Sequence, residues 1–265
     1  MVLQNLHCHT LFDDGKASAE DMVIAARDAG LSSVGVSLHS PIPGHESWCC
    51  AEEKVPAFIA EMRRLREAYA GQITVYCGIE FDLDGICDLS AFDYVIASVH
   101  GLDEYSIDNT PEEAMRLIAH FGTPEKSAEA YFSRMRDIAA IPEADIVGHF
   151  DLITKFDERC ALYDPAAPAY RDAAFAAMEV LNAAGKIFEI NSGAISRGWR
   201  TSPYPSPELL RHLKTLGGRI CISSDAHSAD AIACAFEQCE ALALSCGFEE
   251  LWQFDGSEFR PVKII

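Results

Sequence analysis

Nine imidazole and carboxylate side chains stand at or just past the ends of short apolar runs. They are His7, His9, Asp14, His39, Glu80, His100, His149, Asp225 and His227. Imidazole and carboxylate are the groups that hold zinc, iron or manganese in proteins. Histidines with independent structural roles have no reason to gather at the same end of successive strands. The set therefore predicts a metal centre.

Spacing within the set supports this interpretation. In the run His7, Cys8, His9 the two imidazoles are two residues apart, so they share one face of an extended strand. Asp225 and His227 repeat that spacing after a later strand. A carboxylate has two oxygens, so Glu80 could bridge two metal ions where a histidine normally could not.

Several polar residues beside this set need a separate interpretation. Asp13 could be the ligand instead of Asp14, but Gly15 favours a turn that directs Asp14 inward. Asp82 and Asp84 follow Glu80 closely and are expected to be solvated. The remaining histidines are divided in the same way: His120 and His212 lie in helical segments and are expected at the surface, whereas His45, in the loop after His39, could face a substrate.

The elements that must position these side chains alternate between strand and helix. Apolar runs predict strands at Val2–Leu6, Val34–Leu38, Ile73–Cys77, Tyr94–Val99, Asp145–Val147, Ile187–Ile190 and Arg219–Ile222. Helices are predicted at Met22–Ala29, Glu52–Tyr69, Pro111–His120, Pro124–Ala140, Asp172–Ala184, Ser206–Leu216 and Ala229–Ala243, the first capped by Ser18 with Asp21. Parallel strands carry their C-terminal ends to one rim. We expect a distorted seven-stranded β/α barrel formed by one domain over residues 1–265, with an open doubly wound sheet as the alternative.

Composition narrows the class of protein. The formal charge of −20 argues against a nucleic-acid partner. The ten cysteines form no CxxC pair, and there is neither a signal peptide nor an apolar run near ~20 residues, so a cytoplasmic protein without a membrane partner is expected. The oligomeric state cannot be inferred.

The motifs HCHTLFDDG, VSLHSP, GIEFD, SVH, GHFD and SSDAH resemble those of the PHP (polymerase and histidinol phosphatase) family of metallohydrolases. The resemblance implies a TIM-like barrel of the PHP type and three divalent ions (zinc, iron or manganese). It assigns His7, His9, Glu80 and Asp225 to the first ion, Asp14, His39 and His227 to the second, and Glu80, His100 and His149 to the third. One position departs from the family: Leu38 stands where an aspartate is common, which could loosen His39 and weaken the second ion.

The stretches SVHGLDEYSIDNTPEE and GHFDLITKFDE further resemble the histidinol-phosphate phosphatase branch. The implied activity is hydrolysis of a small phosphate monoester, in which a hydroxide bridging the metals attacks phosphorus. Asp14, His39 and Arg197 are the predicted catalytic residues, and Arg197, Lys155, Arg159 and His45 the predicted substrate contacts. The acid that protonates the leaving group is not assigned.

Four questions stay open at this point. The substrate could be another small phosphate ester or a nucleotide, and the protein could bind metal without catalysis. Asp103, Glu104 and Asp108 could face the amino-alcohol end of histidinol phosphate, although a solvated acidic loop is the favoured interpretation. The run Trp48, Cys49, Cys50 fits either an exposed loop or a lid over the site.

Overall fold

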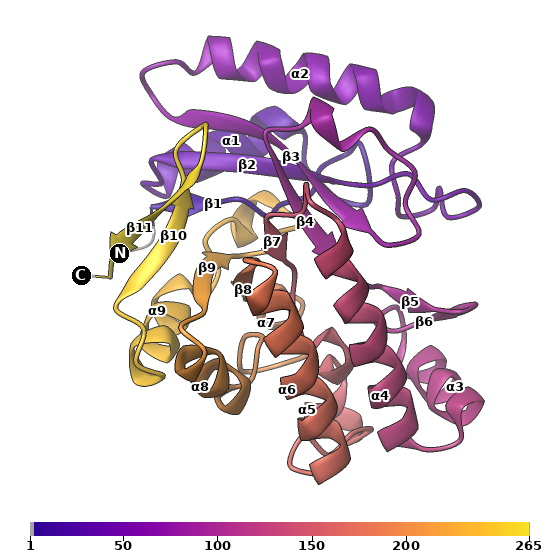
Figure 1. Ribbon diagram of the computed structural model, residues 1–265. Coiled ribbons are helices and arrows are strands. Elements are labelled where there is room, and N and C mark those ends of the chain that lie inside the picture. Colours follow the sequence, from indigo (N-terminus) through magenta and orange to yellow (C-terminus); the bar gives the residue numbers. More distant parts are fainter. Residues whose placement is uncertain (1–2, 265) are drawn as a thin grey trace.

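In the computed structural model, which describes residues 3–264, seven parallel strands curve into a nearly closed barrel (Figure 1). Their order in the sheet is β1 (Gln4–Asn5), β2 (Ser33–His39), β3 (Thr74–Asp82), β4 (Tyr94–Ser98), β7 (Ile146–Val147), β8 (Ile187–Asn191) and β9 (Arg219–Ser223). Just beyond β1 and β9, Cys8 pairs with Ala226 in an isolated parallel bridge. This contact brings the two edges together, so the barrel prediction is confirmed and the open sheet is wrong.

Helices pack around the barrel or lie in the segments that leave the C-terminal ends of its strands. They are α1 (Ala19–Asp28), α2 (Val55–Ala68), α3 (Pro111–Phe121), α4 (Pro124–Met135), α5 (Asp157–Cys160), α6 (Pro168–Ala183), α7 (Gly193–Ser196), α8 (Pro207–Thr215) and α9 (Phe236–Ser245). Ser18 and Asp21 form the expected capping box at α1. The last predicted helix was too long, because Ala235 adopts a left-handed φ of 54° and separates α9 from a short 3-10 turn, η5 (Ala229–Ala231).

Tyr94 fills the barrel interior and explains two glycines in the middle of neighbouring strands. A Cβ atom on Gly35 would lie 2.2 Å from Tyr94 Oη, and one on Gly78 would lie 2.1 Å from Tyr94 Cζ. The Tyr94 hydroxyl donates a hydrogen bond to the Leu6 carbonyl. The ring therefore ties β4 across the barrel to β1, and the two glycines leave the room that it needs.

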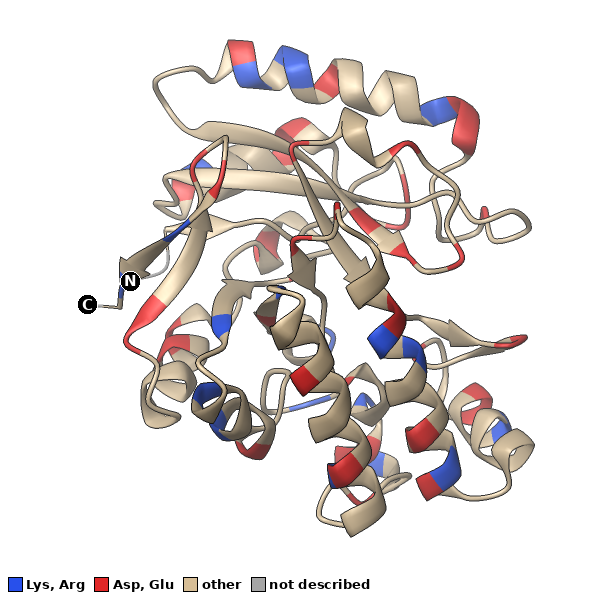
Figure 2. Cartoon of the chain, viewed as in Figure 1, with Lys and Arg blue, Asp and Glu red and all other residues tan. Residues whose placement is uncertain are grey.

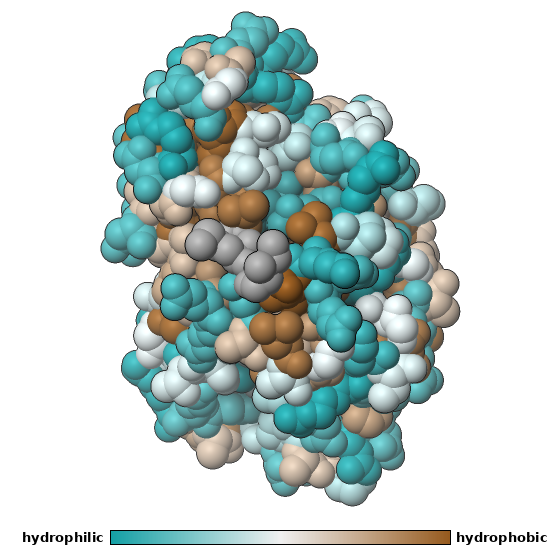
Figure 3. All heavy atoms as spheres, turned by 90° about the vertical axis from the view of Figure 1, so that its left-hand side faces the viewer, coloured by the Kyte–Doolittle hydropathy of each residue, from teal (hydrophilic) through white to brown (hydrophobic). Residues whose placement is uncertain are grey.

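The end of the barrel at the strand N-termini is closed by a hairpin, β10 (Glu250–Phe254) and β11 (Phe259–Lys263), that the sequence analysis missed. Phe254 packs 5.0 Å from the Tyr76 ring and exchanges two 2.8 Å hydrogen bonds between its backbone and the Gln4 side chain. Figure 3 looks onto this side, where several hydrophobic side chains are visible near the middle of a largely hydrophilic face.

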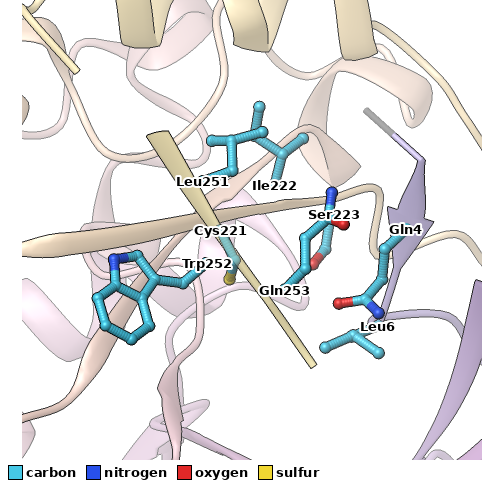
Figure 4. Close-up of a pocket in the computed structure, with 8 residues that line it drawn as sticks. All are labelled: Gln4, Leu6, Cys221, Ile222, Ser223, Leu251, Trp252 and Gln253. Carbon is cyan, nitrogen blue, oxygen red and sulfur yellow. The ribbon is translucent and has the colours of Figure 1, made fainter. Parts of the chain in front are cut away.

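A small cavity lies where this hairpin meets the barrel (Figure 4). It is lined by residues of β1, β9 and β10 and has a volume of about 10 Å³. That volume matches a single water molecule and is far too small for a metabolite. This cavity is therefore not a candidate binding site.

Other features bear on the predicted class of protein. Acidic residues are spread over helices and loops, and Lys and Arg gather on no single face in the view of Figure 2. All ten cysteines are free thiols. Within residues 3–264 no helix is long and apolar enough to cross a membrane.

Candidate metal centre

A cavity of about 790 Å³ opens at the C-terminal ends of the strands. Seven of the nine predicted ligands line it: Asp14, His39, Glu80, His100, His149, Asp225 and His227. His7 and His9 are fully buried at its base, in contact with Glu80. The structure thus brings all nine side chains together. Their order along the rim follows from the parallel strands, for example in β2 and β3, where His39 pairs directly with Glu80.

Glu80 lies at the middle of the group. Its Oε2 atom is 3.1 Å from His7 Nε2, 3.3 Å from His9 Nε2 and 3.0 Å from His39 Nδ1; its Oε1 atom is 2.8 Å from His149 Nε2 and 3.4 Å from His100 Nε2. The Ser98 hydroxyl donates to Oε1 at 2.7 Å. Both carboxylate oxygens thus face imidazoles, which is the arrangement that a bridging ligand needs.

Three of these imidazoles contact a second carboxylate through Nδ1, the ring nitrogen that faces away from Glu80. His7 Nδ1 lies 2.7 Å from Glu189 Oε1, His9 Nδ1 lies 2.9 Å from Asp13 Oδ2, and His100 Nδ1 lies 3.1 Å from Asp82 Oδ2. Each carboxylate accepts the Nδ1 proton and thereby leaves Nε2 with a lone pair directed at the centre. Carboxylates behind metal-ligating histidines commonly have this function.

These partners revise the sequence analysis. Asp82 is buried beside His100, so the expectation of a solvated side chain is wrong; Asp84 is exposed and pairs with Arg134. Asp13 contacts His9, whereas Asp14 faces the rim. Glu189 was missed altogether, although a glutamate inside the apolar run Ile187–Ile190 is a usable signal, since buried acids need a partner.

The donor set can be tested for its fit to a metal ion. His7 Nε2 and His9 Nε2 are buried, and neither has a hydrogen-bond partner among the described residues. Besides Glu80 Oε2, both face Asp225 Oδ1, at 3.7 and 3.4 Å. Two imidazole lone pairs and two carboxylate oxygens therefore converge with no donor between them. A divalent cation satisfies such a set, so the residues fit a metal site.

The charges of the group agree with this assignment. Burial lowers the pKa of His7, but Glu189, Glu80 and Asp225 together raise it to about 10. Burial raises the pKa of Glu80, yet His7, His39 and His100 hold it well below its usual range. His39 differs, because burial and the neighbouring His9 lower its pKa to about 4. The carboxylates are therefore ionised at neutral pH and attract a cation.

A second grouping surrounds Asp14. Its Oδ1 atom is 3.2 Å from His227 Nε2 and 3.7 Å from His39 Nε2, and His9, Asp14, His39 and His227 each offer a ligand atom within 4.8 Å of the others. Two further groups meet the same limit, His7 with His9 and Asp225, and His39 with Glu80 and His100. The groups overlap, so the division of ligands among individual ions stays a prediction.

Leu38 does not leave His39 without support. The Leu38 side chain is fully buried in the hydrophobic core. The backbone N–H of His39 donates to Asp13 Oδ2 at 2.9 Å, and its carbonyl accepts from the Cys50 N–H at 3.3 Å. Asp13 thus holds both His9 and the end of β2.

Arg197 lies at the rim and binds the predicted ligands themselves. Its Nη2 donates to Asp225 Oδ2 at 2.9 Å, and its Nη1 lies 3.0 Å from His227 Nδ1. Asp225 has a left-handed φ of 49°, which points its side chain inward as β9 ends. A Cβ on Gly193 would lie 2.6 Å from Asp225 Oδ2, so only glycine leaves room for this contact.

The other predicted substrate contacts differ in position. Lys155 lines the cavity but donates to the carbonyl oxygen and to Oδ2 of Asp108, at 2.6 and 2.9 Å. His45 also lines the cavity, from an exposed loop. Arg159 is exposed and is not among the lining residues, because its guanidinium donates to the Gly198 carbonyl and lies 4.7 Å from the centre of the Trp199 ring.

Comparisons with known proteins find one family model and relatives that share one name. The sequence model of the PHP domain matches residues 5–193. A protein of Deinococcus radiodurans named "Probable histidinol-phosphatase" is 30% identical over 237 residues, covering 83% of this chain and 85% of its own. A protein of the same name from Schizosaccharomyces pombe is 25% identical over 257 residues, covering 88% and 82%.

Solved structures share the fold. Histidinol phosphate phosphatase from Lactococcus lactis, crystallised with zinc, L-histidinol and phosphate, superposes with a TM-score of 0.76 at 22% identity. The alignment covers 97% of this chain and 98% of that protein. At these identities the likeness supports the barrel and its closure.

Proposed function

The chain belongs to the PHP domain family, and from this we propose that it is a metal-dependent phosphomonoesterase that hydrolyses L-histidinol phosphate. The observation that carries the proposal is the convergence of the His7 and His9 lone pairs with Glu80 and Asp225. The names of the curated relatives, and the ligands of the Lactococcus enzyme, support this choice of substrate.

We propose three divalent ions on the basis of charge. The described residues that line the cavity include nine carboxylates and only three cationic side chains, a net charge of −6 with neutral histidines. Such a cavity repels a phosphate dianion, whereas three divalent ions would neutralise it. Their ligands would be His7, His9, Glu80 and Asp225; Asp14, His39 and His227; and Glu80, His100 and His149.

Bound divalent ions would supply Lewis acidity and an ionised water near neutral pH. The side chains of the protein would orient the ligands and bind the phosphate group. Glu189, Asp13 and Asp82 hold three imidazoles in orientation. Arg197, already in contact with Asp225, would direct its guanidinium at the phosphate oxygens, and Lys155 would add a second positive charge. Asp14 and His39 stay predicted as catalytic residues at the mouth of this group.

The proposal is tested by measuring phosphate release from L-histidinol phosphate, propyl phosphate and a nucleoside monophosphate with metal-replete protein. We expect kcat/KM for histidinol phosphate to exceed the other values by about 10³-fold, within the range that a site built for one ligand achieves. Equal values on all three esters would overturn the substrate assignment. A higher value on the nucleotide would replace it.

Metal dependence is tested with His9→Ala, using His212→Ala on α8 as the matched control. The first variant should lose bound metal and hydrolysis together, because His9 contacts both Glu80 and Asp225. The second should retain both. Metal loss without any change in hydrolysis would favour a metal-binding protein that is not a catalyst.

A further inference from the structure

Trp48 stands at the edge of the predicted metal rim. Its ring centroid lies 5.1 Å from that of His39 and 5.5 Å from that of His100, with interplanar angles of 84° and 63°. It also lines the cavity. His39 and His100 are both predicted metal ligands, so the indole lies beside the predicted metal centre.

The loop that carries Trp48 is anchored where it leaves β2 and where it returns. Ser40 N–H donates to the Glu80 carbonyl at 2.9 Å, and Ser40 Oγ accepts from Asp82 N–H at 3.1 Å. After Trp48, Cys49 and Cys50 are buried. In between, residues 43–47 are exposed. The loop is therefore anchored on both sides of its exposed part, and Trp48 lies at the edge of the cavity that it lines.

The cavity also borders a second hairpin, β5 (Gly101–Leu102) and β6 (Tyr105–Ser106), that projects on the same side of the barrel as this loop (Figure 1). Its turn is acidic. Asp103 pairs with His120 at 2.8 Å, whereas Glu104 has no hydrogen-bond or ion-pair partner among residues 3–264. An aromatic wall and a carboxylate that line one cavity suit a flat, positively charged group.

We propose that Trp48 is a specificity-determining residue, whose indole packs against the alcohol part of the substrate and selects monoesters with a cationic nitrogen ring or amine. This inference rests on the proposed function and deepens it. In this arrangement the metal rim, Arg197 and Lys155 bind the phosphate group, and Trp48 binds the alcohol that is released. A change at Trp48 should therefore affect recognition of the alcohol without affecting recognition of the phosphate.

The test compares kcat/KM for L-histidinol phosphate with kcat/KM for propyl phosphate, whose alcohol is neutral and aliphatic. Trp48→Leu should lower this ratio about tenfold, the loss expected for one aromatic contact. Trp48→Phe retains a ring and should restore most of the ratio. Trp252→Leu, on β10 at the closed end of the barrel, is the matched control and should leave the ratio unchanged.

Inhibition by the two products distinguishes a role in recognising the alcohol from a purely structural role, which would not change one inhibition constant more than the other. In Trp48→Leu the inhibition constant of L-histidinol should rise about tenfold, whereas that of inorganic phosphate should change less than about twofold. Equal losses on both esters and both inhibitors would show that Trp48 only supports His39 and His100, and would overturn the inference.

The outcomes also separate the two proposals. If the unmodified enzyme does not prefer histidinol phosphate over propyl phosphate, both proposals fail. If it does prefer it and Trp48→Leu has the same preference, only the role of Trp48 is wrong.

Discussion

At the scale of single residues, the centre depends on side chains that never reach the substrate. Glu189 is fully buried and uses both oxygens: Oε1 accepts from His7, and Oε2 accepts from the His149 N–H at 3.0 Å and from Asn191 Nδ2 at 2.8 Å. It thereby orients one predicted ligand through its ring and a second through its backbone. A charge this deep in the barrel would be unfavourable without such partners.

Glu189→Gln tests this role. The amide keeps the volume but loses the negative charge that fixes the His7 tautomer, so metal affinity should fall about 10- to 100-fold. Metal titration of the apoprotein measures it. Glu179→Gln, at an exposed position beside His212, should leave affinity unchanged. An unaltered affinity in Glu189→Gln would contradict the assignment of Glu189 as a positioning residue.

At the scale of elements, two parts of each strand have different functions. Their C-terminal ends present the ligands, and their middle sections pack around Tyr94, with Gly35 on β2 and Gly78 on β3 beneath the ring. Packing of the barrel interior therefore affects the positions of the ligands, because β2 and β3 carry His39 and Glu80 only a few residues after these glycines.

A double-mutant cycle tests this packing. Gly78→Ala should lower the free energy of unfolding by about 1–3 kcal/mol, because the new methyl group overlaps the Tyr94 ring. In a Tyr94→Leu background the same change should cost less, with a coupling of about 1–2 kcal/mol. Urea unfolding followed by circular dichroism measures both. Equal costs in the two backgrounds would mean that the ring does not limit this position.

At the scale of the whole molecule, negative charge gathers where the strands end. The chain has a formal charge of −20, and its main cavity concentrates carboxylates around histidines. In metal-free protein, protons take the place of cations: the pKa of His7 rises from 6.5 to about 10 despite the opposing effect of burial. Metal and protons therefore compete for one group of side chains.

This competition predicts a pH dependence of stability. Because the folded-state pKa of His7 lies above its unfolded value, its stabilising contribution is complete below pH 6.5 and is lost as the pH rises toward 10. The melting temperature of metal-free protein should therefore fall over this range. Metal-loaded protein should melt on the order of 10 °C higher near neutral pH, with a gap that widens at higher pH.

Thermal unfolding with and without a chelator at pH 6.5, 8 and 9.5 checks this expectation. A chelated protein whose melting temperature is flat or rises over this range would contradict it. The expectation of a single catalytic domain over residues 1–265 stays a prediction, and a single unfolding transition in these measurements would support it.

The amino-acid sequence by itself determined the strands, most of the helices and the nine rim side chains, because periodicity, caps and strand ends are local properties of the chain. It also predicted a common rim, since parallel strands place their C-terminal ends together, but the contact between Cys8 and Ala226 that closes the barrel is tertiary. The hairpin at residues 250–263 was missed although Asp255 and Gly256 form a local turn signal between its two strands. What only the tertiary structure shows is that Phe254 packs against the barrel.

Only the tertiary structure decided which neighbours serve the nine side chains. Glu189 is 182 residues from His7, and Asp108 is 47 residues from Lys155, so neither contact leaves a trace in sequence spacing. Asp13 and Asp82 looked like an alternative ligand and a solvated acid, and folding placed each behind a histidine. A buried carboxylate is stable only beside a hydrogen-bonding or cationic group, and the tertiary structure determines which group lies beside it.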